Sequence, residues 1–117
     1  MIMQKVKPLA RDLFPGALEL MILRILKRQS LHGYALVQEI KISSDDLLQV
    51  EEGSLYPALQ RLLRAGHLKA EWKISSTNRR VRTYTLTASG RKHVEKEMSS
   101  FDRMLEGIRR VFKAAES

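Results

Sequence analysis

The period of the hydrophobic positions changes along the chain, from helical spacing to strand spacing and back. After Phe14-Pro15-Gly16, apolar residues recur at helical spacing, and proline suits the first turn of a helix. This pattern predicts a first helix that ends near Gln29-Ser30. A second, shorter helix is predicted from about His32 to Ile42, followed by a polar and acidic loop over 43–52.

A third helix is predicted over about Ser54–Ala65, closing on Gly66, a residue type common at helix C-termini. With Ser54 as N-cap, Pro57 falls at the third helical position, where an N–H has no partner within the helix. The apolar residues of this segment fall on one helical face, and the opposite face is polar and basic. The apolar face consists of Leu55, Leu59, Leu62 and Leu63.

The next segment has a period of two, which is typical of a half-buried strand. Apolar and charged residues alternate over 68–74, and a polar turn follows over 75–80. A returning strand over 82–86 completes a β-hairpin with an arginine-rich tip. Because Trp72 and Tyr84 both fall on the apolar side of this alternation, we expect them to pack in the core rather than to stack on bases.

A long final helix is predicted to begin after Thr87, its N-cap. Its apolar residues are spaced alternately four and three apart over nearly three heptads, and most of the remaining positions are charged. So long a helix overhangs a small body, which favours a partner helix from a second copy of the chain. The predicted dimer interface comprises Leu18 and Met21 of the first helix and Val94, Met98, Phe101, Leu105, Ile108 and Phe112 of the last.

Length and composition indicate one domain with three parts. The chain has 117 residues, 44% of them hydrophobic, and no cysteine, which excludes disulfides and Cys-based zinc sites. The parts are a basic arm over 1–13 containing Lys5, Lys7 and Arg11, a central domain over 14–87, and a C-terminal helix over 88–117. No stretch has the form of a signal peptide or membrane span, so we expect a soluble, cytoplasmic protein without membrane contact, metal or cofactor.

The positive charge is concentrated in one third of the sequence. The net charge is +8, and the segment from Gly53 to Val94 accounts for all of it, with Glu71 as its one acid. Such concentration is what a surface that faces phosphates requires. The nine basic residues of this segment are Arg61, Arg64, Lys69, Lys73, Arg79, Arg80, Arg82, Arg91 and Lys92.

Three helices followed by a hairpin, with charge on the third helix and the hairpin tip, are typical of a winged helix-turn-helix. In that architecture the third helix enters the major groove of DNA, and the wing contacts the adjacent backbone or minor groove. The predicted fold class is therefore mainly α with a small β-hairpin, an α+β winged helix-turn-helix domain with a long C-terminal dimerisation helix.

The sequence also resembles the PadR-type transcriptional regulators over roughly residues 14–93. The ordered set of short motifs at these spacings is more specific than any one of them. The motifs are Gly16-Ala17-Leu18-Glu19-Leu20, His32-Gly33-Tyr34, Gly53-Ser54-Leu55-Tyr56-Pro57-Ala58-Leu59, Arg61-Leu62, Gly66, Trp72, Arg79-Arg80, Tyr84 and Leu86-Thr87-Ala88-Ser89-Gly90.

This resemblance implies a homodimeric repressor that binds a pseudo-palindromic operator. The single C-terminal helix is similar to the compact branch of the family, in which one helix makes the dimer. In several relatives of that branch the dimer interface encloses a pocket for planar small molecules. Phe101 lies in the middle of the seam, where a dimer would stack it near its symmetry mate, and it is the candidate effector-binding residue. Core packing is the competing interpretation of its position.

The exposed face of the third helix and the wing supply the expected DNA contacts. Gln60 and Arg61 have side chains suited to adenine and guanine edges, respectively. A phosphate contact or a solvated surface position is an equal alternative for Arg61. For Tyr34, a place in the core or at its edge competes with a phosphate contact. The full predicted DNA-binding set is Tyr34, Ser54, Tyr56, Pro57, Gln60, Arg61, Arg64, Lys73, Arg79, Arg80 and Arg82.

Other functional classes find less support. A winged-helix dimer that engages a protein or RNA is the main alternative to a DNA-binding repressor. An enzyme is a third class, but the sequence contains no nucleophile motif, phosphate loop or metal-binding spacing such as HExxH. His32, His67 and His93 stand apart in sequence, and we expect them to be structural or surface residues.

Overall fold

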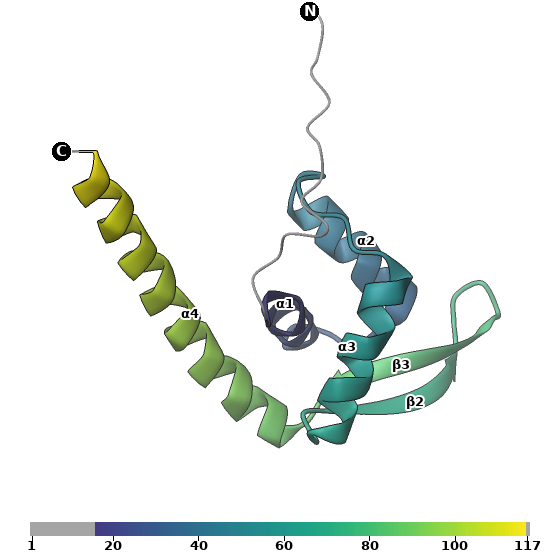
Figure 1. The fold of residues 1–117 in the computed structure, drawn as a ribbon. Coiled ribbons are helices and arrows are strands. Elements are labelled where there is room, and N and C mark those ends of the chain that lie inside the picture. Colours follow the sequence, from purple (N-terminus) through teal and green to yellow (C-terminus); the bar gives the residue numbers. More distant parts are fainter. Residues whose placement is uncertain (1–15, 117) are drawn as a thin grey trace, which may run out of the picture.

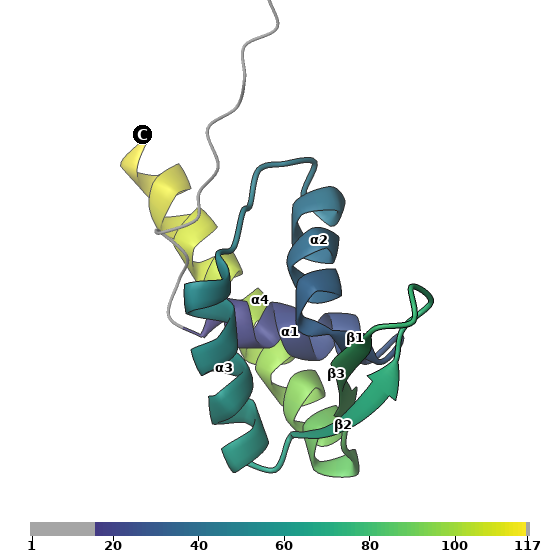
Figure 2. The same ribbon diagram turned by 90° about the vertical axis from the view of Figure 1, so that its right-hand side faces the viewer.

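The computed structural model describes residues 16–116, and these form four helices and a small sheet. The predicted basic arm lies outside the described residues. The winged helix-turn-helix fold class is confirmed, with the long C-terminal helix beside the domain (Figures 1 and 2). In chain order the elements are α1 (Ala17–Leu26), β1 (Leu31–His32), α2 (Gly33–Ser43), α3 (Glu52–Arg64), β2 (Leu68–Ile74), β3 (Arg80–Leu86) and α4 (Ala88–Ala115).

The first two helices follow the predicted pattern with shifted ends. α1 ends at Leu26, before the predicted Gln29-Ser30. α2 begins directly after His32, whose Nδ1 accepts a hydrogen bond from the backbone N–H of Ala35 at 3.3 Å. His32 is thus the N-cap of α2, a structural role that fits the sequence prediction for this histidine.

The start of α3 differs from the prediction. Glu51, not Ser54, occupies the N-cap position, and the helix begins at Glu52. Pro57 therefore lies inside the helix, where its missing N–H leaves the carbonyl of Gly53 without its intrahelical partner. Pro57 is exposed, so water can solvate this carbonyl, and the helix continues to Arg64.

The sheet has three antiparallel strands in the order β1-β3-β2 within the described part of the chain. The predicted hairpin is confirmed as β2 and β3, with Leu68 opposite Leu86 at its base and Ile74 opposite Arg80 at its tip. The two-residue strand β1 was not predicted, because it is too short to show a period. It joins the start of α2 to the hairpin by pairing Leu31 with Tyr84.

The core lies where α1, α2, α3 and the base of the hairpin meet. The predicted inner face of α3 is confirmed: Leu55 and Leu59 are fully buried, Leu62 is buried and Leu63 is partly buried against the same cluster. The remaining buried apolar residues come from all four helices, the hairpin and the loop before α3. They are Ile22, Leu23, Leu26, Leu36, Ile40, Val50, Ala58, Leu68, Tyr84, Leu86 and Val94.

The first turn of α4 is fixed to the domain through its N-cap. As predicted, Thr87 is the cap: its Oγ1 accepts from the N–H of Gly90 at 3.0 Å and donates to the carbonyl of Gly66 at 2.7 Å. Val94, two turns along, is fully buried. The C-terminal half of α4 then extends away from the other elements (Figure 1), so one end of this helix belongs to the domain and the other does not.

No helix among residues 16–116 combines the length and the apolar composition that crossing a membrane requires.

Candidate nucleic-acid interface

The exposed face of α3 carries the side chains predicted to contact bases. Ser54, Pro57 and Gln60 are exposed, and Tyr56 is 43% exposed. The ring of Tyr56 packs against the start of α2, because a β-carbon added at Gly33 would lie 3.0 Å from the Tyr56 hydroxyl oxygen. This contact fixes one side of Tyr56 and leaves its other side open. The N-terminal half of α3 thus presents a polar surface to solvent, in which one side of the Tyr56 ring is held by α2.

Arg61 is held by a partner on another helix. Its Nε donates to Oε1 of Glu19 in α1 at 3.1 Å, and its Nη2 donates to the same oxygen. The Arg61 side chain is 55% exposed and that of Glu19 26%. Arg61 therefore lies at the surface as predicted, but its guanidinium is engaged by Glu19. Arg64, one turn later, is exposed.

The hairpin has two regions with different surroundings on one face. At its base, Ala70 pairs with the buried Tyr84 and belongs to the core. Toward its tip, Trp72 pairs with Arg82, and Trp72 is 56% exposed. The prediction that Trp72 packs in the core is wrong, whereas that for Tyr84 is confirmed. The reason is that the alternation gives the face of a strand, but the core ends before the strand does.

The wing tip carries the predicted arginines in a defined turn. The N–H of Ser75 donates to the carbonyl of Arg79 at 2.7 Å, and the Oγ of Ser75 accepts from the N–H of Arg79 at 3.2 Å. Asn78 adopts a φ of 58°, the left-handed conformation that a tight turn needs. Arg79, Arg80 and Arg82 are all exposed. Their backbone is thus fixed while their side chains reach into solvent.

Lys73 is also exposed, but strand alternation places it on the face opposite Trp72. It pairs in register with Val81. Lys73 is therefore on the side of the wing away from Arg80 and Arg82.

A groove joins the start of α2, the exposed face of α3 and the wing. Tyr34, at the start of α2, is 60% exposed and lies on its rim. Figure 2 shows α2, α3 and the hairpin on one side of the molecule, with α4 behind α1. The groove encloses about 470 Å³, and its side chains come from His32, Tyr34, Tyr56, Gln60, Trp72, Arg80, Val81, Arg82 and Tyr84.

This groove brings together residues that are far apart in the sequence, including Tyr34, Gln60 and Arg80. Trp72 is a groove residue that the sequence prediction placed elsewhere. A usable signal existed: its neighbours across the hairpin are arginines, and a core position opposite an arginine is unfavourable. The groove's mixture of guanidinium, amide and phenol groups can donate hydrogen bonds to phosphates and base edges.

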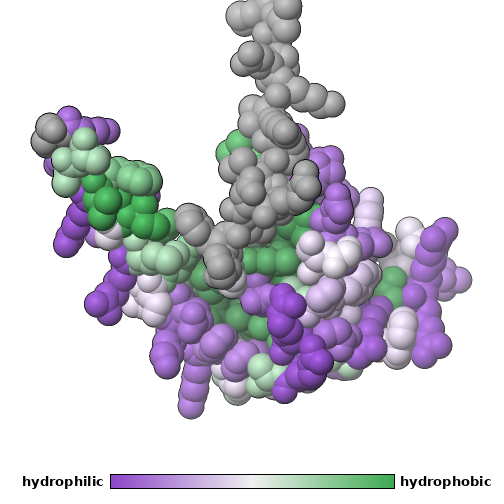
Figure 3. All heavy atoms as spheres, in the orientation of Figure 1, coloured by the Kyte–Doolittle hydropathy of each residue, from purple (hydrophilic) through white to green (hydrophobic). Residues whose placement is uncertain are grey.

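The second predicted surface, the seam of α4, changes character along the helix. Val94 is fully buried in the core of the single chain, so it is not available to a partner, and its prediction as an interface residue is wrong. Met98, Phe101, Leu105 and Ile108 are partly buried, and Phe112 is 65% exposed. Hydrophobic side chains gather on the outer half of α4 (Figure 3).

An apolar hollow of about 380 Å³ lies beside the middle of this seam, between α1, the end of α2 and α4. Met21, predicted as an interface residue, lines it, and Leu18 on the same helix is partly buried against the core. The apolar side chains of the hollow include Met21, Ile25, Leu48, Met98, Phe101 and Leu105.

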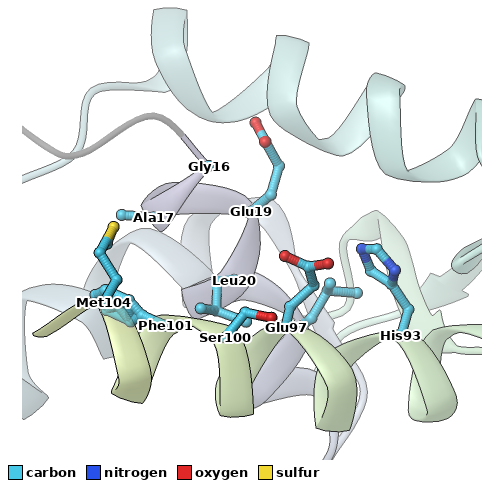
Figure 4. Close-up of a pocket in the computed structure, with 10 residues that line it drawn as sticks. Gly16, Ala17, Glu19, Leu20, His93, Glu97, Ser100, Phe101 and Met104 are labelled. Atoms are coloured by element: carbon cyan, nitrogen blue, oxygen red, sulfur yellow. The ribbon is translucent and has the colours of Figure 1, made fainter. Parts of the chain in front are cut away.

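A smaller and more polar hollow of about 260 Å³ lies between the start of α1 and α4 (Figure 4). Glu19, Glu97 and His93 line it together with Phe101 and Met104. Phe101 thus borders both hollows, which is where the structure places the candidate effector residue. Among residues 16–116, no group of three His, Asp or Glu side chains is arranged to hold a metal ion.

Two histidines that stand apart in the sequence meet at the start of α4. The rings of His67 and His93 stack with centroids 4.0 Å apart and an angle of 9° between their planes. Burial lowers the pKa of His67, and the neighbouring His93 lowers it further. His67 lies between α3 and β2 and His93 lies in α4, so residues that stand apart in sequence are in contact here.

Comparison with known proteins identifies the class of protein to which this fold belongs. Residues 22–96 match the model of the transcriptional regulator PadR-like family. A transcriptional regulator from Clostridium thermocellum superposes with a TM-score of 0.75 at 26% identity, covering 82% of this chain and 93% of that one. An uncharacterized protein from Lysinibacillus sphaericus is 26% identical over 83% of this chain and 89% of its own length.

A further similar structure is that of Bacillus subtilis PadR in complex with operator DNA. It superposes with a TM-score of 0.62 at 26% identity, over 70% of this chain and 46% of that chain. The fold and the groove define a winged-helix, DNA-binding transcriptional regulator. The chain belongs to the PadR-like family.

Proposed function

We propose that this regulator is a repressor that binds a pseudo-palindromic operator as a homodimer. The observation that carries the proposal is the single groove shared by the exposed face of α3 and the wing arginines. An α3 helix in the major groove would bring Tyr56 and Gln60 to base edges, while Arg80 and Arg82 reach the adjacent backbone. Operator DNA bound to Bacillus subtilis PadR supports this use of the fold.

The proposed dimer forms through α4 of two copies. Leu105, Ile108 and Phe112 continue the heptad spacing beyond the body of the domain, and Phe112 is largely exposed. The apolar hollow beside Met21 and Phe101 is continuous with this seam and can receive apolar side chains of the second copy. A two-fold dimer would present two copies of α3 to successive major grooves, which accounts for a pseudo-palindromic operator.

The proposal also includes a small planar effector that binds beside Phe101. Phe101 borders both the apolar hollow and the polar hollow that contains Glu19 and Glu97. A planar molecule bound beside Phe101 would contact α1 and α4 together, and so could alter how the two copies of α3 are spaced. A compound that binds there should shift the midpoint of thermal unfolding, and Phe101→Ala should reduce that shift.

The test of the proposal is binding to a duplex from upstream of the protein's own gene. Fluorescence anisotropy measures this binding across a salt series. Specific binding should survive competitor DNA, with the logarithm of affinity falling linearly with the logarithm of salt concentration. Equal affinity for every sequence, or a flat salt response, would contradict the repressor proposal and favour a protein or RNA partner. Reporter expression with and without the regulator then distinguishes repression from activation.

A further inference from the structure

The exposed Trp72 carries a cation on its ring. The guanidinium carbon of Arg80 lies 4.6 Å from the centre of the Trp72 ring. Arg80 pairs in register with Ile74, and Arg82 is the residue directly opposite Trp72. The Arg80 side chain therefore crosses the hairpin diagonally to reach the indole, a separation that long side chains can span. This is a cation–π contact on the open part of the wing.

The contact limits where an otherwise mobile side chain can go. An exposed arginine has many rotamers, and ordering it on DNA costs conformational entropy. The indole holds the Arg80 guanidinium beside the groove that also contains Tyr56 and Gln60. A guanidinium that stacks on a ring by its flat face keeps its N–H groups at the edge, free to donate to a phosphate.

We propose that Trp72 is a positioning residue for DNA binding, which holds Arg80 in the orientation that contacts the DNA backbone. The proposal rests on the proposed function, because it requires the groove to bind duplex DNA. Trp72 is 56% exposed, whereas Leu68 and Ala70 nearer the base of the same strand are covered, so its ring is accessible beside the groove. Exposed cation–π contacts correspond to about two- to fivefold in affinity, so the effect is measurable.

The experiment is a double-mutant cycle on binding to a fluorescein-labelled duplex of random sequence at low salt. A backbone contact acts on every sequence, so no operator is needed. Trp72→Leu should weaken binding about two- to fivefold. Combined with Arg80→Ala, it should weaken binding no further than Arg80→Ala alone, because its effect acts through Arg80.

Arg79 provides the matched control, since it is an exposed arginine directly before Arg80. Trp72→Leu should lower the DNA affinity of the Arg79→Ala variant by the same factor as it lowers that of the wild-type protein. Trp72→Phe keeps an aromatic face and should restore part of the loss. Circular dichroism and thermal melting establish that each variant is folded. If Trp72→Leu does not fold, the same cycle with Trp72→Phe decides, with a smaller expected coupling to Arg80.

Two results would overturn the inference while leaving the proposed function intact. One is a folded Trp72→Leu variant that binds DNA with wild-type affinity. The other is a Trp72→Leu substitution that lowers the affinity by the same factor whether residue 80 is arginine or alanine. If the wild-type protein itself binds no duplex even at low salt, both the inference and the proposed function fail. The outcomes are therefore distinguishable in one set of titrations.

Discussion

Arg61 on the exposed face of α3 forms an ion pair with Glu19 of α1, so α3 and the helix beside α4 are joined through a charged contact. Glu19 also lines the polar hollow beside Phe101 (Figure 4). The carboxylate of Glu19 and an acceptor on DNA would compete for the same guanidinium. In the proposed complex, this contact would set how readily Arg61 binds DNA.

Replacing Glu19→Gln should raise the affinity for duplex DNA about two- to fivefold, since an exposed ion pair is worth at most about 1 kcal/mol. The change is nearly isosteric, removes one negative charge and frees Arg61 for a phosphate or base. Anisotropy titrations across a salt series measure the effect. In an Arg61→Ala background the same change should have a smaller effect. Weaker binding by Glu19→Gln would mean that Glu19 orients Arg61 for DNA instead of competing with it.

The wing and α3 should respond differently to substitution. Arg79→Ala with Arg80→Ala removes two wing cations, so affinity should fall by a similar factor on all sequences and the salt dependence should become shallower. Gln60→Ala should mainly reduce the preference for the operator over random duplex. The charge-matched control is Lys96→Ala with Arg103→Ala, two exposed residues of α4. Identical behaviour of the Gln60 and wing variants would contradict this division of roles.

The seam of α4 offers a closely matched pair of positions for testing the dimer. Phe112 and Val111 are adjacent and are 65% and 66% exposed, but only Phe112 continues the heptad spacing. Phe112→Asp should shift the protein toward the monomer in sedimentation velocity, because it places a charge in the proposed interface. Val111→Asp should leave the oligomeric state unchanged. Equal effects of the two substitutions would argue against the seam.

Gly90 packs tightly against the domain in the first turn of α4. A β-carbon added there would lie 2.2 Å from the carbonyl oxygen of His67 and 2.7 Å from Cδ1 of Leu86. Gly90→Ala should therefore lower the free energy of unfolding by about 1–3 kcal/mol or more, as α4 is forced away. Gly53→Ala, whose added carbon meets nothing within 4 Å, should instead raise it by about 0.5–1 kcal/mol. Urea denaturation measures both, and an unchanged midpoint for Gly90→Ala would show that α4 can shift without cost.

The stacked histidines should make stability depend on pH. Because burial and then His93 lower the pKa of His67, the unfolded state binds more protons than the folded state at mildly acidic pH. The contribution is fully present above the unfolded pKa of about 6.5 and is lost as the pH falls toward the folded pKa. His67→Gln should flatten the decline in urea midpoint between about pH 7.5 and 5.5. A decline as steep as that of the wild-type protein would exclude His67 as its source.

Sequence and structure agree most closely where the pattern is local. The helical period placed Leu55, Leu59 and Leu62 on the inner face of α3, and the core confirms it. The N-cap role of Thr87 was also predictable, because a cap depends on a residue and its next few neighbours. The start of α3 was not, since Ser54 is the preferred N-cap residue by type, whereas the helix begins after Glu51 without a side-chain cap.

By itself, the sequence determined the element types, the location of the positive charge and the heptad seam, because each depends on spacing along a few turns or one strand. Tertiary structure alone decided where the core ends and which side chains meet across it. It exposed Trp72 under Arg80, buried Val94 and joined Arg61 to Glu19. The period of a helix or strand fixes the direction of a side chain, but only the packing of the elements fixes what lies in that direction.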